Sequence, residues 1–298
     1  MKNKILFTGS SGKVGKLIIP FLIGNGYEIE YYDILENNDI FDQSKLEKKM
    51  KNCYAVIHSA AIPHPDLKAY SDEDYWKLNF EGSVSVLEIA KKLKLKKFIF
   101  FSSGSVYGLW GGKCKPDKFP ITENQNIPTL KNGQTFYGYT KIEFEKFLKK
   151  NRGSLDVSVL RIEGIDKGHT RLEWINGFND LNSMCKTPSK PAFHFFTRLS
   201  PENCYQAVTK CLTSKHKFEI MNISNEYVHW SIDCQRWIKE NYPRVKNYTK
   251  GNQSLYGIDK AKKIIGFKPY PIDDHFLHRD KIESYYYNQS YFGKIGKP

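Results

Sequence analysis

Short apolar segments that alternate with amphipathic helical segments constrain the fold of this chain more than any other feature. Within residues 1–165 each apolar run spans a few residues without polar alternation, which is typical of strands buried on both faces of a parallel sheet. The alternation predicts a doubly wound α/β fold with helices on both sides of a parallel sheet. The expected strands are 4–8, 28–33, 55–58, 98–102 and 157–161, and the expected helices are 12–23, 44–50, 72–93 and 134–149.

A glycine-rich turn, Thr8-Gly-Ser-Ser-Gly-Lys-Val-Gly15, joins the first expected strand to the first expected helix. Glycines at this spacing permit a tight turn, a close approach of the backbone to a pyrophosphate, and close packing of helix on strand. The pyrophosphate would lie at the helix N-terminus, where N–H groups and the helix dipole favour an anion. The turn therefore predicts a Rossmann dinucleotide site. Its expected cofactor residues are Gly9, Ser11, Gly12, Lys13, Val14 and Gly15.

Asp33 ends the second expected strand, about 20 residues after the glycines. An acid at this place accepts hydrogen bonds from the ribose hydroxyls of adenosine. The same charge repels a 2′-phosphate, and no arginine follows at Ile34 or Leu35. This combination favours NAD over NADP as the cofactor.

A tyrosine, a lysine and a serine form the candidate catalytic set. Tyr137 and Lys141 are four residues apart in an expected helix, which places them on one helical face. A nearby ammonium favours the phenolate, so we expect Tyr137 to act as an acid or base near neutral pH. Ser103 follows a buried strand and is placed to donate a hydrogen bond to the substrate oxygen.

The second part of the chain is less regular than the first. Three prolines interrupt the pattern between residues 188 and 201, and the further expected elements are helices over 201–213, 231–241 and 259–265 and a strand over 218–223. We expect residues 1–165 to form the NAD-binding Rossmann domain, with a later return of residues 201–223. Residues 166–298 are then expected to form a small C-terminal substrate-binding lobe interleaved with it.

The net charge of +14 does not by itself indicate a nucleic-acid partner. Lysine supplies nearly all of the excess and is spread along the chain, which is typical of a solvated basic surface. No apolar run approaches the roughly 20 residues of a membrane helix, and the N-terminus lacks a signal peptide. The six cysteines show no C-x-x-C spacing, so we expect no metal site. We expect a cytoplasmic protein with no membrane or nucleic-acid partner.

Together these motifs resemble the extended short-chain dehydrogenase/reductase family, the NAD-dependent epimerase/dehydratase group, over about residues 5–161. The resemblance implies that Tyr137 exchanges the hydroxyl proton of the substrate, while a hydride passes between the substrate carbon and the nicotinamide. Lys141 would lower the pKa of Tyr137 and hold the nicotinamide ribose, and Ser103 would orient the substrate oxygen. The resemblance also implies a homodimer. It adds as cofactor residues Asp39 and Ile40 at the adenine, His58, Ala60 and Ala61 in the turn beside the cofactor, and Asn79 in support of the active site.

Departures from the family pattern narrow the expected reaction. Nucleotide-sugar 4,6-dehydratases of the family carry an Asp-Glu pair where this chain has Gly104 and Ser105, which argues against elimination of water. Residues 162–165 and 196–203 also lack the motifs usual in nucleotide-sugar enzymes. The pattern Arg161-Ile-x-Gly164, together with Ser200-Pro201, resembles the uronate dehydrogenase branch more. In that branch Arg171 would clamp a substrate carboxylate as a bidentate fork. The candidate substrate residues are His64, Ser103, Ser105, Glu163, Arg171 and Arg198.

The sequence therefore predicts an NAD-dependent oxidoreductase that acts on a secondary alcohol of a sugar or sugar-derived substrate. A nucleotide-sugar epimerase that retains its NAD is the main alternative, because it uses the same three catalytic residues. A non-catalytic NAD-binding regulator is a further alternative, against which the intact catalytic set argues.

Overall fold

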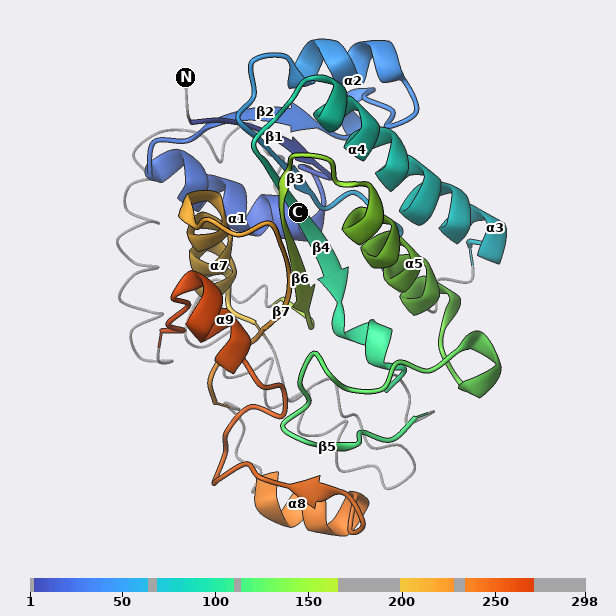
Figure 1. Cartoon of the computed structure of the whole chain (residues 1–298), viewed down its shortest axis with the longest axis vertical. Helices are drawn as coiled ribbons and strands as arrows, with labels where there is room; N and C mark the ends of the chain where they lie inside the picture. The colour runs from blue at the N-terminus through green and yellow to red at the C-terminus, as the bar shows by residue number, and fades with distance from the viewer. Residues whose placement is uncertain (1–2, 64–68, 110–113, 166–198, 228–233, 271–298) are drawn as a thin grey trace.

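The computed structural model describes residues 3–63, 69–109, 114–165, 199–227 and 234–270 (Figure 1). Its centre is a sheet of six parallel strands in the order β2-β1-β3-β4-β6-β7. This parallel sheet confirms the predicted α/β fold. The strands are β1 (Lys4–Thr8), β2 (Glu28–Tyr32), β3 (Ala55–His58), β4 (Lys97–Ser103), β6 (Asp156–Ile162) and β7 (Phe218–Ile223).

The strand order reverses between β1 and β3, because the chain runs outward to β2 and then crosses back. In open parallel sheets, ligands bind at such a reversal, outside the carboxyl ends of the strands. Thr8 pairs with both Tyr32 and His58, and Ser103 pairs with Ile162, so these strand ends lie along one edge of the sheet. The expected cofactor and catalytic residues thus follow strands that end on the same side.

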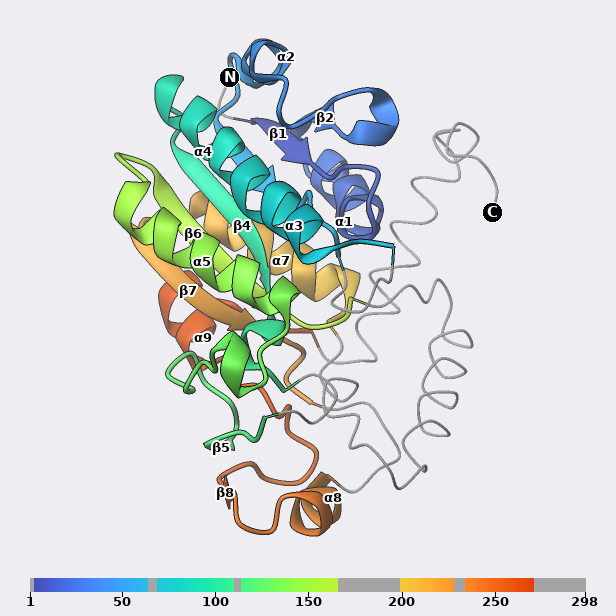
Figure 2. The ribbon, with the colours of Figure 1, turned by 90° about the vertical axis from the view of Figure 1, so that its right-hand side faces the viewer.

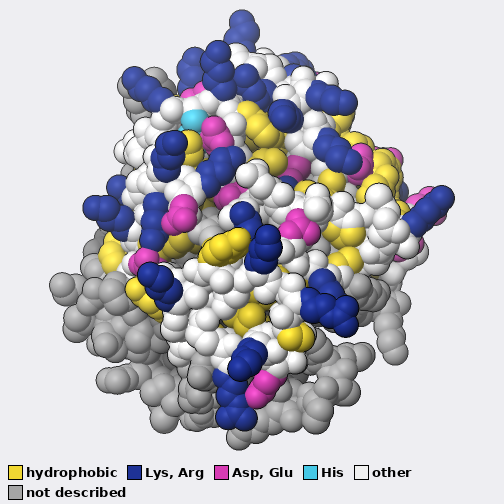
Figure 3. Space-filling view, turned by 60° about the horizontal axis from the view of Figure 1, so that its bottom comes forward, with side chains coloured by type: hydrophobic (Ala, Val, Ile, Leu, Met, Phe, Trp, Pro, Cys, Tyr) yellow, Lys and Arg dark blue, Asp and Glu magenta, His cyan; other side chains and the backbone are white. Residues whose placement is uncertain are grey.

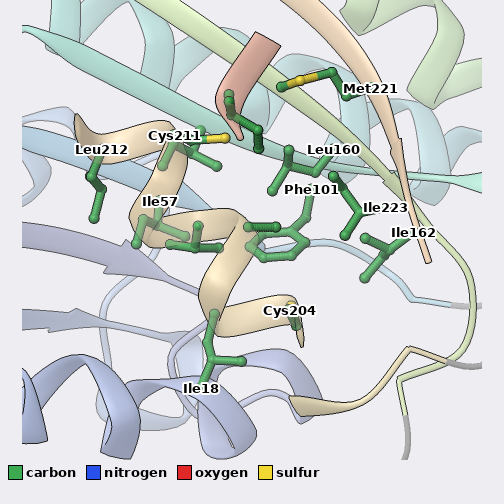
Figure 4. Close-up of a cluster of buried hydrophobic side chains, with 14 of the residues drawn as sticks. Ile18, Ile57, Phe101, Leu160, Ile162, Cys204, Cys211, Leu212, Met221 and Ile223 are labelled. Atoms are coloured by element: carbon green, nitrogen blue, oxygen red, sulfur yellow. The ribbon is translucent and has the colours of Figure 1, made fainter. Parts of the chain in front are cut away.

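Helices cover both faces of the sheet, as Figure 2 shows from the side. Alternate strand residues face opposite layers, so Ile5 and Phe7 pack with one set of helices and Leu6 packs with the other. The first layer holds α1 (Lys13–Gly24), α7 (Pro201–Thr213) and α9 (Asp259–Ile265). The second holds α2 (Gln43–Met50), α4 (Gly82–Lys92) and α5 (Phe136–Asn151). Figure 4 shows side chains of α7 and of the sheet meeting in the first of these two cores.

The long helix expected over residues 72–93 is divided in the structure. It begins as α3 (Asp72–Tyr75), continues as a π-helical segment over Trp76–Glu81 and then becomes α4. Asn79 lies in the π segment, where its side chain bonds to the backbone of Ile62. Single π turns inside α-helices occur often at functional sites. Apolar periodicity did not reveal this segment, because the extra residue barely changes the pattern.

A third hydrophobic cluster lies beyond the carboxyl ends of the strands. It includes residues of β5 (Lys118–Phe119) and α8 (Cys234–Asn241), and β5 forms a short parallel pair with β8 (Lys246–Asn247) (Figure 1). Residues 201–223 return to the main sheet as α7 and β7, as expected. Residues 258–267 also return, because Ile258, Ile265 and Phe267 pack in the main core. The division of the chain into a Rossmann domain and a C-terminal lobe stays a prediction.

Basic side chains are scattered over the described surface. Figure 3 shows Lys and Arg spread across one face with Asp and Glu among them. None of the described helices is both long and apolar enough to cross a membrane. Within the same residues, no group of three or more His, Cys, Asp and Glu side chains is arranged to hold a metal ion.

Candidate active site

The glycine turn lies against the end of β3. Gly9 adopts a φ of +72°, and a Cβ there would lie 2.6 Å from the backbone nitrogen of Ala60. A Cβ on Gly15 would overlap the backbone oxygen of Ser10, so both positions require glycine for space. No side chain caps α1 at Gly12, and its first turn faces the same edge as the strand ends. This helix start without a side-chain cap suits a dinucleotide pyrophosphate.

Two carboxylates lie beside the glycine turn. Asp33 accepts a hydrogen bond from the backbone N–H of Ser11 and another from that of Leu35, each at 3.0 Å. Each oxygen keeps a further lone pair for a ribose hydroxyl. Ser11 Oγ also donates to Glu36 at 3.2 Å, which brings a second negative charge to the same place. Sequence reasoning missed Glu36, although it lies only three residues after Asp33. The pair supports the preference for NAD over NADP.

His58 takes a supporting position in the structure. Its side chain is fully buried, and its two ring nitrogens bond to Thr8 Oγ1 at 2.6 Å and Ser83 Oγ at 2.8 Å. Burial lowers the pKa of His58 to about 3, so the ring is neutral. Both ring nitrogens of His58 thus have protein partners, and its predicted contact with the cofactor stays a prediction. Asn79 is also fully buried and accepts a hydrogen bond from the backbone N–H of Ile62, which directly follows Ala60 and Ala61.

Of the two residues expected at the adenine, Asp39 is exposed and Ile40 is buried. The carboxylate of Asp39 is exposed and accepts a hydrogen bond from the backbone N–H of Phe41 at 2.9 Å. Ile40 is buried in the space that Gly82 leaves on α4. We infer that Asp39 is available to a ligand and that Ile40 supports the loop. At the start of α1, Lys13 is exposed and Val14 packs partly against the core.

The three predicted catalytic residues meet at the end of β4. Tyr137, in the first turn of α5, shares a side-chain hydrogen bond with Ser103. Lys141 Nζ lies 5.8 Å from the centre of the Tyr137 ring and 4.8 Å from that of Phe100. It also donates to the backbone oxygen of Phe101 at 3.0 Å. Tyr137 and Lys141 are 7% and 2% exposed, so both can act only on a group bound directly beside them.

Burial dominates the electrostatics of this set. It raises the pKa of Tyr137 to about 12, the hydrogen bond from Ser103 opposes the rise, and the charge of Glu163 adds to it. Burial lowers the pKa of Lys141 to about 7, against the pull of Glu145. The expectation that the ammonium alone brings Tyr137 near neutral pH is therefore not met in the protein by itself. A low-dielectric site disfavours both charged forms together.

A buried polar network behind the catalytic set was not predicted. Arg161 on β6 forms an ion pair with Glu145 on α5, through Nη2 at 2.6 Å and Nε at 3.1 Å. Ser102 Oγ donates to the same carboxylate at 2.6 Å. Arg161 Nη1 also contacts the hydroxyl of Tyr107, which donates to Asn222 at 2.6 Å. The network ties α5 to the ends of β4, β6 and β7.

Two of the predicted substrate residues beyond Ser103 lie at the same edge. Ser105 donates its backbone N–H to Ser103 Oγ at 3.0 Å. Glu163 follows β6, contacts Gly104 and shares a side-chain hydrogen bond with Tyr256. Sequence reasoning missed Tyr256 as a partner in this site. The predicted substrate residues His64, Arg171 and Arg198 lie outside the described residues.

A family model described as the NAD dependent epimerase/dehydratase family matches residues 5–163, more than half of the chain. The chain belongs to this family. Its membership confirms the resemblance drawn from the glycine turn and the Ser103, Tyr137 and Lys141 set. It also makes NAD the cofactor, in agreement with the uncapped start of α1 and the two carboxylates beside it.

Curated proteins similar to this chain include UDP-glucose 4-epimerases. The enzyme uge1 of Schizosaccharomyces pombe is 27% identical over 187 residues, which cover 54% of this chain and 51% of that protein. The putative enzyme of Methanocaldococcus jannaschii is 30% identical over 161 residues, which cover 49% and 50%. The chain therefore spans about half the length of the curated relatives it matches.

Solved structures of the family share the fold over nearly the whole chain. The UDP-glucose 4-epimerase of Thermotoga maritima has a TM-score of 0.65 at 20% identity, covering 96% of this chain and 99% of that one. A mutated uronate dehydrogenase has a TM-score of 0.62 at 18% identity, covering 95% and 86%. At such identities the likeness establishes the doubly wound fold and leaves the reaction open.

Proposed function

We propose that this chain is an epimerase that inverts a secondary alcohol centre of a nucleotide-linked sugar and retains its NAD. The observation that carries the proposal is the joined Ser103 and Tyr137 hydroxyls beside buried Lys141, at the edge of the sheet where the NAD turn lies. The curated relatives favour the epimerase over the dehydrogenase, which was the first expectation from the sequence.

The residues of the site divide the chemistry among them. NAD, when bound, supplies a hydride acceptor that can also return the hydride. Tyr137 takes the proton of the substrate hydroxyl as the carbon is oxidised and gives it back when the carbon is reduced. Ser103 donates a hydrogen bond to the substrate oxygen as it gains carbonyl character. Inversion follows when the oxidised sugar presents its other face before reduction.

Water elimination lacks the residues it needs in the β4 turn. Gly104 and Ser105 stand where the dehydratases of the family carry their acid pair. The buried site instead suits a reaction in which one proton and one hydride leave and return. The homodimer implied by the resemblance remains a proposal that light scattering of the purified protein tests.

The test is to incubate the purified protein with UDP-glucose and follow both the sugar and the cofactor. We expect the 4-epimer to appear without net NADH, with NAD recovered from the denatured protein in near-stoichiometric amount. Tyr137→Phe should reduce turnover by at least about a hundredfold while NAD binding is kept. Tyr139→Phe, two residues along the same helix and stacked on Trp76, is the matched control and should leave turnover near that of the wild type.

Two results would change the assignment. Stoichiometric NADH with an oxidised sugar would establish the dehydrogenase instead. Full turnover by Tyr137→Phe would show that another group exchanges the proton.

A further inference from the structure

A carboxylate occupies the space of the missing side chain at position 104. Gly104 directly follows Ser103 at the end of β4, and a Cβ built on it would overlap Oε1 of Glu163. The glycine at 104 is therefore what admits the acid from the neighbouring strand β6. Gly104 has no positive φ, so its role here is to leave space.

The position of this carboxylate is fixed from a second side. The hydroxyl of Tyr256 forms a hydrogen bond with Glu163, and Tyr256 is only 4% exposed. The Tyr256 ring lies against Tyr107 with 5.7 Å between the ring centres, and its backbone bridges to Ile121. The hydrogen bond from buried Tyr256 thus fixes the Glu163 carboxylate next to Gly104.

The charge of Glu163 reaches the catalytic hydroxyl. Burial is the largest cause of the raised pKa of Tyr137, and the charge of Glu163 raises it further. Glu163 is itself partly exposed, in contrast to Glu145, which is buried in its ion pair with Arg161. The carboxylate therefore lies at the same strand end as the Ser103 and Tyr137 hydroxyls.

We propose that Glu163 recognises the substrate by accepting a hydrogen bond from a sugar hydroxyl next to the reacting carbon. An ionised carboxylate only accepts hydrogen bonds, so it favours hydroxyl donors. It repels a second carboxylate, and like charges set against each other are strongly unfavourable in a partly desolvated site. The structure assigns to this position a preference for neutral sugars over sugar acids.

The inference rests on the proposed function for its choice of ligands. It also opposes the sequence-based expectation of a uronate, in which an arginine clamps the substrate acid. UDP-glucose and UDP-glucuronic acid are suitable probes, because they differ in a carboxylate attached to the carbon next to C4. Their ratio of affinities measures the effect of Glu163 and cancels the common contribution of the nucleotide.

The experiment measures the dissociation constants of both probes by calorimetry on NAD-loaded protein. We expect the wild type to bind UDP-glucose at least about tenfold more tightly, a difference of about 1.4 kcal/mol. Glu163→Gln should reduce this ratio by about tenfold, since it removes the charge and adds an amide donor. Glu219→Gln is the control, because it removes a carboxylate from the amino-terminal half of β7 and should leave the ratio unchanged.

A second variant keeps the test independent of how well Glu163→Gln folds. Gly104→Ala retains the charge but displaces the end of a flexible side chain, so it should lower the same ratio. NAD binding of each variant confirms that the glycine turn is intact.

An unchanged ratio in both site variants, a wild type that prefers the acid, or a wild type that binds neither probe overturns the inference. Absence of epimer formation with the ratio shift intact overturns the proposed function alone.

Discussion

The buried ion pair between Glu145 and Arg161 offers the most quantitative test of how the site is held. The two side chains are 4% and 3% exposed, and Arg161 binds both carboxylate oxygens. Glu145→Gln keeps the shape of the side chain but leaves the guanidinium buried without a counter-charge. Breaking a buried pair in this way costs about 3–5 kcal/mol. The amide oxygen of the variant can still accept from Ser102 Oγ and Arg161 Nε, which both donate to Oε1, whereas the amide nitrogen cannot accept from Nη2.

Urea unfolding of the wild type and the variant measures this cost directly. Glu143→Gln is the matched control on the same helix, because Glu143 pairs with Lys146 at the surface and should lose less than about 1 kcal/mol. The variant should also lose turnover through displacement of α5, since Glu145 lies one helical turn after Lys141. NAD binding should fall less, because the glycine turn lies on other strands.

A loss below about 1 kcal/mol for Glu145→Gln would refute the reasoning, because it would mean that solvent or another group neutralises Arg161. The double variant Glu145→Leu/Arg161→Met separates charge from packing. It should recover most of the lost stability, since both buried charges are removed together. It should not recover turnover, because Ser102 and Tyr107 lose their shared partners.

Three further predictions follow from the same geometry. Lys141→Met should stabilise the fold at pH 7 by a few kcal/mol, because burial lowers the pKa of Lys141 from its ordinary value of 10.5 to about 7 and the wild type loses stability as the pH falls between these values. The gain measured by urea unfolding should shrink toward pH 10, and a gain that does not change with pH would contradict the prediction. Gly15→Ala should destabilise by about 1–3 kcal/mol and weaken NAD binding, because its Cβ meets the backbone of Ser10; unaltered NAD affinity in calorimetry would argue against the turn. Asp33→Ala should weaken NAD more than NADP by about tenfold or more, and an unchanged ratio of dissociation constants would remove the acid from cofactor choice.

Sequence reasoning succeeded where the signal was local. Within residues 1–165 the strands are short continuous apolar runs and the helices have apolar periodicity, and Tyr137 and Lys141 are four residues apart in one helix. The network from Arg161 to Asn222 escaped it, because these side chains are 61 positions apart in the chain and meet only in the folded sheet. Glu163 was predicted as a substrate residue from its position after a strand. Its contact with Gly104 depends on the pairing of β4 with β6, which the sequence alone does not show.

Burial acts on Tyr137 and Lys141 in a way that makes their ionisation depend on what is bound. It raises the pKa of the phenol to about 12 and lowers that of the ammonium to about 7. The protein alone therefore favours the neutral tyrosine, and a cation bound beside the phenol lowers its pKa. We expect the near-ultraviolet absorbance difference between wild type and Tyr137→Phe to show phenolate only near pH 12 without NAD, and below about pH 10 with it. Phenolate below about pH 9 without NAD would show that Lys141 suffices.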